Sequence, residues 1–130
     1  MLDDFDRRAE ELAEFFGLGL ADARAELGKG FVALHTQVAE DFRRADPHTD
    51  DELISWYRTT TAYAWELSAY HLDCGFNYDG MSGGLAEHLL AARCQRVLCL
   101  GDGIGDLTLA LHARGLLPIY HDLADSQTVA

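Results

Sequence analysis

The chain has 130 residues, of which 22 are acidic and 10 are basic, so its formal net charge at neutral pH is −12. A charge of this sign disfavours binding to nucleic acid, because phosphate backbones are bound by clustered lysine and arginine. The composition is 48% hydrophobic, yet no segment approaches the roughly 20 apolar residues of a membrane-spanning helix. The acidic N-terminus lacks the basic and apolar regions of a secretory signal, so we expect a cytoplasmic protein without a membrane partner.

The first 95 residues predict a helical region. Apolar residues recur there at helical spacing, interrupted by glycines and by one Asp-Pro pair that ends a helix because proline lacks a backbone donor. Thr49 and Glu52 have the spacing of a capping box and mark the start of the longest expected helix. Residues 77–84 form a polar, glycine-rich stretch that predicts a loop. The expected helices are Leu2–Phe16, Leu20–Leu27, Phe31–Ala45, Leu53–Tyr70 and Leu85–Ala92.

The histidines and cysteines predict neither a metal site nor a disulfide framework. The six histidines include no H-x-x-x-H pair and no grouping with cysteine at ligand spacing. The three cysteines are odd in number and lack C-x-x-C spacing, so we interpret them as small buried side chains. His71 and Asp73 lie at the end of the longest expected helix, just beyond Tyr70, and their contact with a substrate is a separate hypothesis.

The most informative stretch runs from Arg96 to Asp106. An apolar strand leads into alternate glycines at positions 101, 103 and 105, and an amphipathic helix follows. Glycine has no Cβ, so such a turn lets the chain bend sharply and lets a ligand lie against the main chain, facing the helix amides. A second strand is expected over residues 117–122. In a right-handed crossover the carboxylate of Asp122 then lies beside the glycine turn.

The segment from Val97 to Gly105 resembles motif I of the class I methyltransferases that use S-adenosylmethionine, and Asp122 matches the acidic residue after their second strand. One position differs from the family's motif, since the family usually has Asp or Glu where this chain has Cys99. The resemblance implies that the glycine turn passes the methionine part of the cofactor and that the later acid binds the ribose. The cofactor-binding residues implied in this way are Gly101, Asp102, Gly103, Gly105 and Asp122.

The same resemblance implies that helices before motif I cover the cofactor or build the substrate pocket. The longest expected helix has an aromatic stripe, and its segment from Trp56 to Tyr63 is the candidate lid. We assign Arg58 to pairing with the cofactor carboxylate, and Tyr57 or Tyr63 to hydrogen bonding or stacking. The alternative is that the stripe packs in a core, as aromatic residues at helical spacing usually do.

Together these patterns predict an α/β fold in two parts. Residues 1–95 form a helical N-terminal cap or lid, and residues 96–130 form the first β-α-β unit of a Rossmann-like methyltransferase fold. Two strands and one helix are too few for a parallel sheet with both faces covered. We therefore expect the chain to be truncated, either the N-terminal piece of a longer protein or a partial reading frame.

The expected function is methyl transfer from S-adenosylmethionine to a small-molecule or protein acceptor, with this chain as the cofactor-binding part. No catalytic residue is assigned, because in this family a general base is expected after strand four. Two alternatives stay open: a noncatalytic helical interaction module and a nucleotide-dependent oxidoreductase segment. The oxidoreductase turn G-x-G-x-x-G requires glycine or alanine at position 106, where this chain has Asp106. The acceptor and the oligomeric state are left open.

Overall fold

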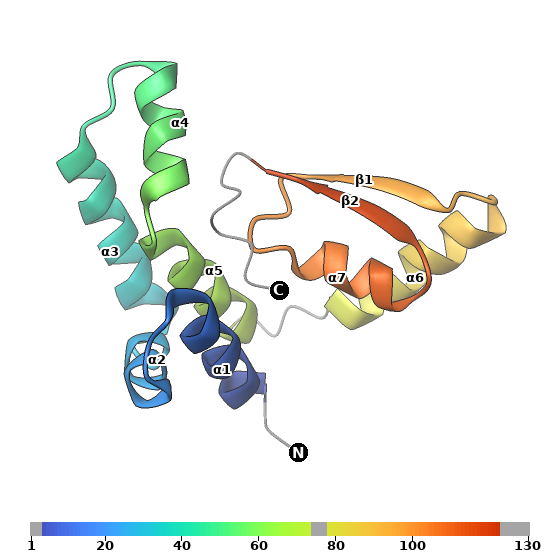
Figure 1. Cartoon of the computed structure of the whole chain (residues 1–130), viewed down its shortest axis with the longest axis horizontal. Coiled ribbons are helices and arrows are strands. Elements are labelled where there is room, and N and C mark those ends of the chain that lie inside the picture. The colour runs from blue at the N-terminus through green and yellow to red at the C-terminus, as the bar shows by residue number, and fades with distance from the viewer. Residues whose placement is uncertain (1–3, 74–77, 123–130) are drawn as a thin grey trace.

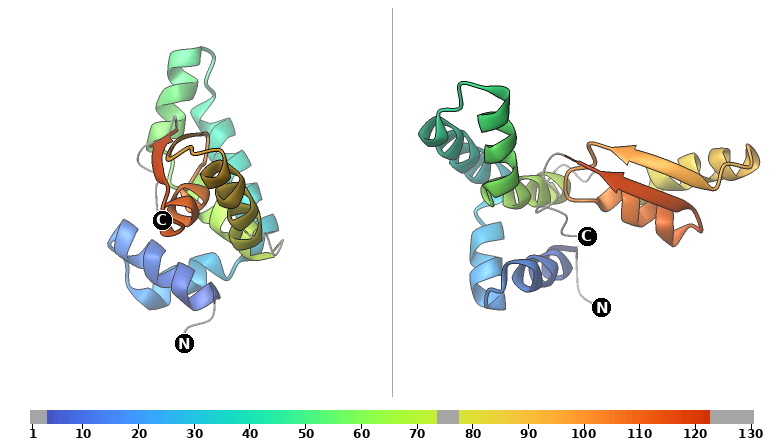
Figure 2. Two further views of the ribbon diagram at one scale, coloured as in Figure 1. Left: turned by 90° about the vertical axis from the view of Figure 1, so that its right-hand side faces the viewer. Right: turned by 45° about the horizontal axis from the view of Figure 1, so that its top comes forward.

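The computed structural model describes residues 4–73 and 78–122. Helices α1–α5 gather in one group, and α6 and α7 lie beside the two strands in a second group (Figure 1; Figure 2). Among the described residues, no helix has both the length and the apolar character needed to cross a membrane. In chain order the elements are α1 (Asp4–Phe16), α2 (Leu20–Leu27), α3 (Gly30–Ala45), α4 (Asp50–Thr59), α5 (Ala62–Asp73), α6 (Tyr78–Ala91), β1 (Arg96–Leu100), α7 (Asp106–Ala113) and β2 (Leu117–His121).

A shared apolar core holds the first group of helices together. Alanines on α1, α2 and α5 allow close approach of the helices, and larger side chains fill the remaining space. Phe16 at the end of α1 stacks on Trp65 of α5 with ring centroids 5.1 Å apart. This packing against α1, α2 and α3 fixes the position of α5, the helix that reaches the candidate site. The buried core residues are Ala9, Leu12, Ala13, Ala23, Leu27, Leu34, Trp65 and Ala69.

The single long helix expected over residues 53–70 is wrong, because the chain breaks between α4 and α5. The capping box at the start of α4 is confirmed, with Thr49 and Glu52 each bonding the other's backbone N–H. The break is at Thr60, whose backbone is extended (φ −70°, ψ 134°). Asp41 of α3 stabilises it by accepting hydrogen bonds from Thr60 Oγ1 at 2.6 Å and from Trp56 Nε1 at 3.0 Å. A tertiary contact therefore overrides the helical periodicity of this segment.

The two strands form a parallel pair in which Cys99 is the register partner of Tyr120. On one face of the pair, Cys99 packs with Ala86 of α6 and Leu111 of α7 in a second buried core. The other face is uncovered in the described structure, and its leucines Leu98 and Leu100 are 58% and 67% exposed. Within the described residues, the sheet is thus a small parallel pair with helices on one side only.

The expected α/β fold with a Rossmann-like domain beginning at residue 96 is wrong. The described residues form seven helices and one sheet of only two strands, so the fold is rich in α-helix. The larger of the two apolar cores contains helical residues alone. The spacing of residues around one glycine turn predicted the two strands and the helix next to it. It did not establish that these elements belong to a larger sheet.

The expected glycine-rich loop over residues 77–84 is also wrong over most of its length, because α6 begins at Tyr78. Ser82 is buried and Gly83 lies next to the Arg114 guanidinium, so these two small residues of the stretch pack against neighbouring groups. Packing of α6 on α7 stabilises a helix that the glycines alone disfavour. The division of the chain into domains at residue 95 stays a prediction, and α6, which precedes it, packs with the strand group.

Candidate functional site

The candidate site is built on the glycine turn that joins β1 to α7. Gly101 and Gly103 both have positive φ, at +68° and +61°, a conformation that residues with a Cβ rarely adopt. A Cβ at Gly103 would lie 2.8 Å from Leu67 Cδ1 of α5, whereas a Cβ at Gly101 would have no atom within 4 Å. The turn therefore packs on α5 at Gly103 and remains open at Gly101.

Asp122, which follows β2, lies at this turn. Its Oδ2 accepts a hydrogen bond from the Gly103 N–H at 2.8 Å, and the Tyr120 hydroxyl donates to the Gly103 carbonyl at 2.6 Å. The parallel pairing of β1 and β2 brings these groups together, since both strands end at the same edge. The structure thus places next to each other the two features that the sequence singled out, while the ribose-binding role of Asp122 stays a prediction.

Asp102 connects the turn to the start of α7. Its carboxylate accepts hydrogen bonds from the backbone N–H of Leu107 at 3.2 Å and of Thr108 at 2.6 Å, and from Thr108 Oγ1 at 2.6 Å. These bonds satisfy amide donors that the first turn of a helix leaves without partners. Asp102 therefore orients α7 relative to the turn, and its expected contact with a cofactor stays a prediction.

Asp106 belongs to a network of charged groups that the sequence did not reveal. Its two carboxylate oxygens accept from Arg8 Nη2 of α1 at 2.6 Å and from His71 Nδ1 of α5 at 2.7 Å. The three side chains are only 12–13% exposed. Burial raises the pKa of Asp106, but the hydrogen bond from His71 and the charge of Arg8 outweigh it and leave the pKa below its ordinary value.

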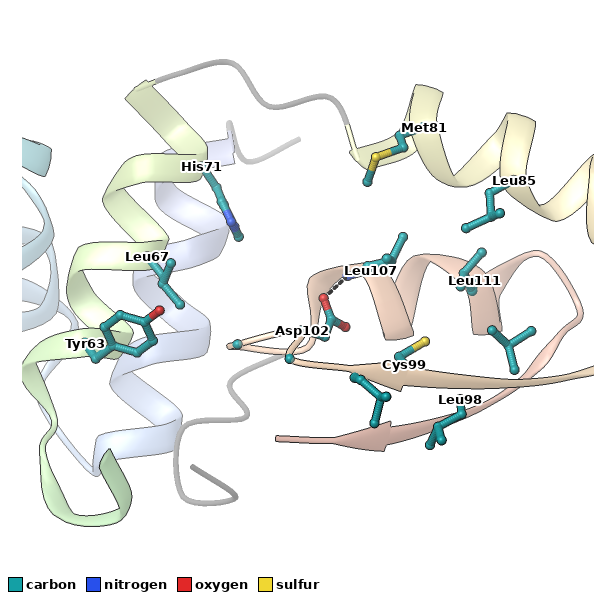
Figure 3. A pocket seen from close by; sticks show the side chains of 14 residues that line it. Tyr63, Leu67, His71, Met81, Leu85, Leu98, Cys99, Asp102, Leu107 and Leu111 are labelled. Carbon is teal, nitrogen blue, oxygen red and sulfur yellow. Dashed lines mark hydrogen bonds between the residues drawn. The ribbon is translucent and has the colours of Figure 1, made fainter. Parts of the chain in front are cut away.

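A cavity of about 410 Å³ lies between α5, α6 and the glycine turn, within the size range of small-molecule sites (Figure 3). Its wall is mainly apolar, with Leu67, Met81 and Leu85 contributed by the helices. The polar side chains in the lining come from Tyr63, His71 and Asp102, and the backbone of Gly101 and Gly103 closes one side. The cavity is therefore an apolar space with a few polar groups beside the turn.

The three candidate lid residues lie in different places. Tyr63 of α5 lines the cavity, and burial together with nearby groups, including Asp122, raises the pKa of its hydroxyl. Tyr57 of α4 packs edge-on against Tyr63 with ring centroids 5.9 Å apart. Arg58 is exposed on α4, and the described cavity lining does not include it. The structure thus brings Tyr63 to the cavity, with Tyr57 behind it, and leaves Arg58 away from the wall.

No family model, curated protein or solved structure matches this chain. The site must therefore be interpreted from its own chemistry. In residues 4–73 and 78–122, no three histidine, cysteine or acidic side chains are grouped so as to hold a metal ion.

The residues present are compatible with an adenosyl sulfonium cofactor. A Cβ at Gly101 would meet open space in the turn that lines the cavity, so a ligand can approach the main chain there. The carboxylates of Asp102 and Asp122 give the turn a negative character that attracts a sulfonium and repels a pyrophosphate, whereas the charge of Asp106 is paired with that of Arg8. Cys99 sits in the apolar core under the turn, where the neighbours Ala86 and Leu111 accommodate a small side chain.

Proposed function

We propose that the glycine turn and Asp122 bind S-adenosylmethionine and that the chain takes part in methyl transfer to a small-molecule acceptor. The observation that carries this proposal is the 2.8 Å hydrogen bond from the Gly103 N–H to Asp122, beside a cavity that Gly101 also lines. The site, and not a fold family, supports the assignment. The cytoplasmic location expected from the N-terminal sequence is part of the same proposal.

Asp122 suits a ribose because a carboxylate accepts hydrogen bonds from hydroxyl groups. The bond from the Gly103 N–H orients the carboxylate at the turn. Bound S-adenosylmethionine would supply an electrophilic methyl group, and the protein's part would be to orient the two reactants and to exclude water. The apolar cavity wall at Leu67, Met81 and Leu85 suits this second task.

Calorimetric titration of the full chain with S-adenosylhomocysteine and, separately, with NAD tests the proposal. We expect S-adenosylhomocysteine to bind and NAD not to bind. Asp122→Ala should weaken S-adenosylhomocysteine binding by about tenfold or more, because a hydrogen bond to a charged group contributes about 1.5–3 kcal/mol. Asp122→Asn should retain part of the affinity, since its amide oxygen can still accept from the Gly103 N–H.

Asp73→Ala is the matched control, because Asp73 also accepts a hydrogen bond from a backbone N–H, that of Phe31 at 2.9 Å, and is not among the cavity residues. Its affinity for S-adenosylhomocysteine should equal that of the unchanged protein. Binding of NAD in place of S-adenosylhomocysteine would favour the oxidoreductase alternative. Binding of neither ligand would leave the helical interaction module as the better interpretation.

A further inference from the structure

The uncovered face of the strand pair carries four large apolar side chains. Side chains alternate between the two faces of a strand, and the register places Leu98 and Leu100 of β1 on the same face as Leu117 and Ile119 of β2. Figure 3 shows Leu98 on the side of β1 away from Leu111. The four side chains are 45–67% exposed. Single exposed apolar residues are normal in proteins, but a contiguous group of this kind marks an interaction site.

A helix is the element that fits this face. Parallel strands are usually covered by helices on both faces. In this protein α6 and α7 cover the opposite face, where Ala86 and Leu111 pack with Cys99. The uncovered face belongs to the same two strands and is equally apolar. The five residues of β1 extend about 17 Å, the length of roughly 11 residues of helix. A short amphipathic helix therefore matches the face in length and in chemistry.

The charged groups at the two ends of the face differ. Arg96 lies on the face at the start of β1, beside Leu117, and Arg93 precedes it in the turn from α6. Both arginines are exposed, and neither forms an ion pair in the part of the chain that the structure describes. At the other end the strands lead to the glycine turn, with the carboxylates of Asp102 and Asp122. A carboxylate on a binding partner is therefore attracted at the Arg96 end and repelled at the turn.

A second copy of this chain does not provide that carboxylate from the same face. A two-fold interface packs a surface against itself, so two such faces would leave Arg96 without an anionic partner. Each chain also has a net charge of −12, which repels another copy. The charge pattern thus favours a different protein as the occupant. The six side chains on the face, none of them acidic, are Arg96, Leu98, Leu100, Leu117, Ile119 and His121.

We propose that this face binds an amphipathic helix of a partner protein. The apolar stripe of the helix packs on the four exposed apolar side chains, and a carboxylate at one end of the stripe lies beside Arg96. The surface is separate from the proposed cofactor site in that Arg96, Leu117 and Ile119 are not among the cavity residues. The interaction does not depend on S-adenosylmethionine. One helix on two strands makes a small interface, of the size found in weak and transient complexes.

Fluorescence anisotropy of a labelled synthetic peptide, titrated with the full chain, tests the proposal. The peptide has about 18 residues, enough to form a helix, with leucines along one face and glutamates at one end of that stripe. A matched peptide has glutamine in place of each glutamate. At physiological salt the Debye length is about 8 Å, so distant acidic residues are screened and the nearby Arg96 decides the preference. We expect the glutamate peptide to bind about three- to fivefold more tightly than the glutamine peptide.

Substitutions on the face test where the peptide binds. Ile119→Ser should weaken binding of the glutamate peptide by about tenfold, because it removes apolar area from the interface. Leu109→Ser is the matched control, since Leu109 is 49% exposed on α7 and lies outside the face. Arg96→Gln should abolish the preference for glutamate over glutamine in the peptide. Arg7→Gln changes the net charge equally at an exposed position of α1 and should retain that preference.

A further variant protects the test against misfolding. If Ile119→Ser lowers the melting temperature below that of the assay, Leu117→Ser decides in its place, with the same expected loss of binding. Failure of the glutamate peptide to bind, equal binding by the face variants and the unchanged protein, or equal binding of the two peptides would overturn the proposal. Self-association of the protein alone in sedimentation, abolished by Ile119→Ser, would overturn it as well, because a second copy would then be the occupant.

Discussion

Arg8 and Asp106 are 98 positions apart in the chain, yet Arg8 Nη2 donates to Asp106 Oδ1 at 2.6 Å with both side chains largely buried. The contact joins α1 to the first turn of α7, and His71 of α5 binds the second oxygen of the same carboxylate. One acidic side chain thus ties the helical group to the glycine turn. The geometry of the cavity between them depends on this network.

Replacement of Arg8 by methionine should destabilise the protein by about 2–3 kcal/mol, because it leaves a largely buried carboxylate without its cation. Chemical denaturation of the two proteins measures the difference in the free energy of unfolding. Arg7→Met is the control, since Arg7 pairs with Asp4 at 3.1 Å where the two side chains are 65% and 83% exposed. It should change the free energy of unfolding by less than about 1 kcal/mol. Equal effects of the two substitutions would show that the buried network does not stabilise the fold.

The stabilisation due to Asp106 should disappear in acid. The pKa of Asp106 in the folded protein lies below its ordinary value of 3.8, so the ionised group stabilises the fold above that pH. As the pH falls below 3.8 towards the folded-state pKa, the carboxylate takes up a proton and this contribution is lost. Urea denaturation should therefore show Asp106→Asn less stable than the unchanged protein near neutral pH.

The difference in the free energy of unfolding between Asp106→Asn and the unchanged protein should become smaller as the pH falls below 3.8 towards the folded-state pKa of Asp106. Asp4→Asn provides the comparison, because Asp4 is on the exposed surface of α1. It removes one carboxylate and should leave the acid dependence close to that of the unchanged protein. A stability difference between Asp106→Asn and the unchanged protein that does not vary with pH would contradict the assigned role of the charge.

Local patterns predicted the local elements of this chain. The strand at 96–100, the glycine turn and the capping box at Thr49 each depend on residues within one short segment, and each has the form expected. The proximity of Asp122 to the turn followed from a second rule, that parallel strands joined by a helix end at the same edge.

The features that the sequence did not predict depend on contacts between distant segments. The break at Thr60 requires Asp41 on another helix, and α6 extends through glycines because α7 packs against it. No local sequence pattern predicts the Arg8–Asp106 pair, because the residues around one of them do not indicate the other as its partner. The prediction of the fold class was wrong for the same reason. A short strand–turn–helix pattern does not determine how many strands the sheet contains.

Substitution of Gly103 by alanine should be markedly more destabilising than substitution of Gly101. Both positions have positive φ, so each alanine carries a conformational cost of about 1–2 kcal/mol. Only at Gly103 does the new Cβ also meet Leu67 Cδ1 at 2.8 Å, which adds an overpacking cost of about 1–3 kcal/mol. Gly101→Ala is thus a control for the backbone term alone, and urea denaturation of the two variants isolates the steric term.

A double-mutant cycle with Leu67→Ala identifies the source of that steric term. Truncation of Leu67 removes the atom that the new Cβ meets, so Gly103→Ala should cost less in the Leu67→Ala background than in the unchanged protein. The same truncation should leave the cost of Gly101→Ala unchanged, because a Cβ there has no neighbour within 4 Å. If the cost of Gly103→Ala is the same in both backgrounds, the turn does not pack on α5 as described, and the cavity between them has a different shape in solution.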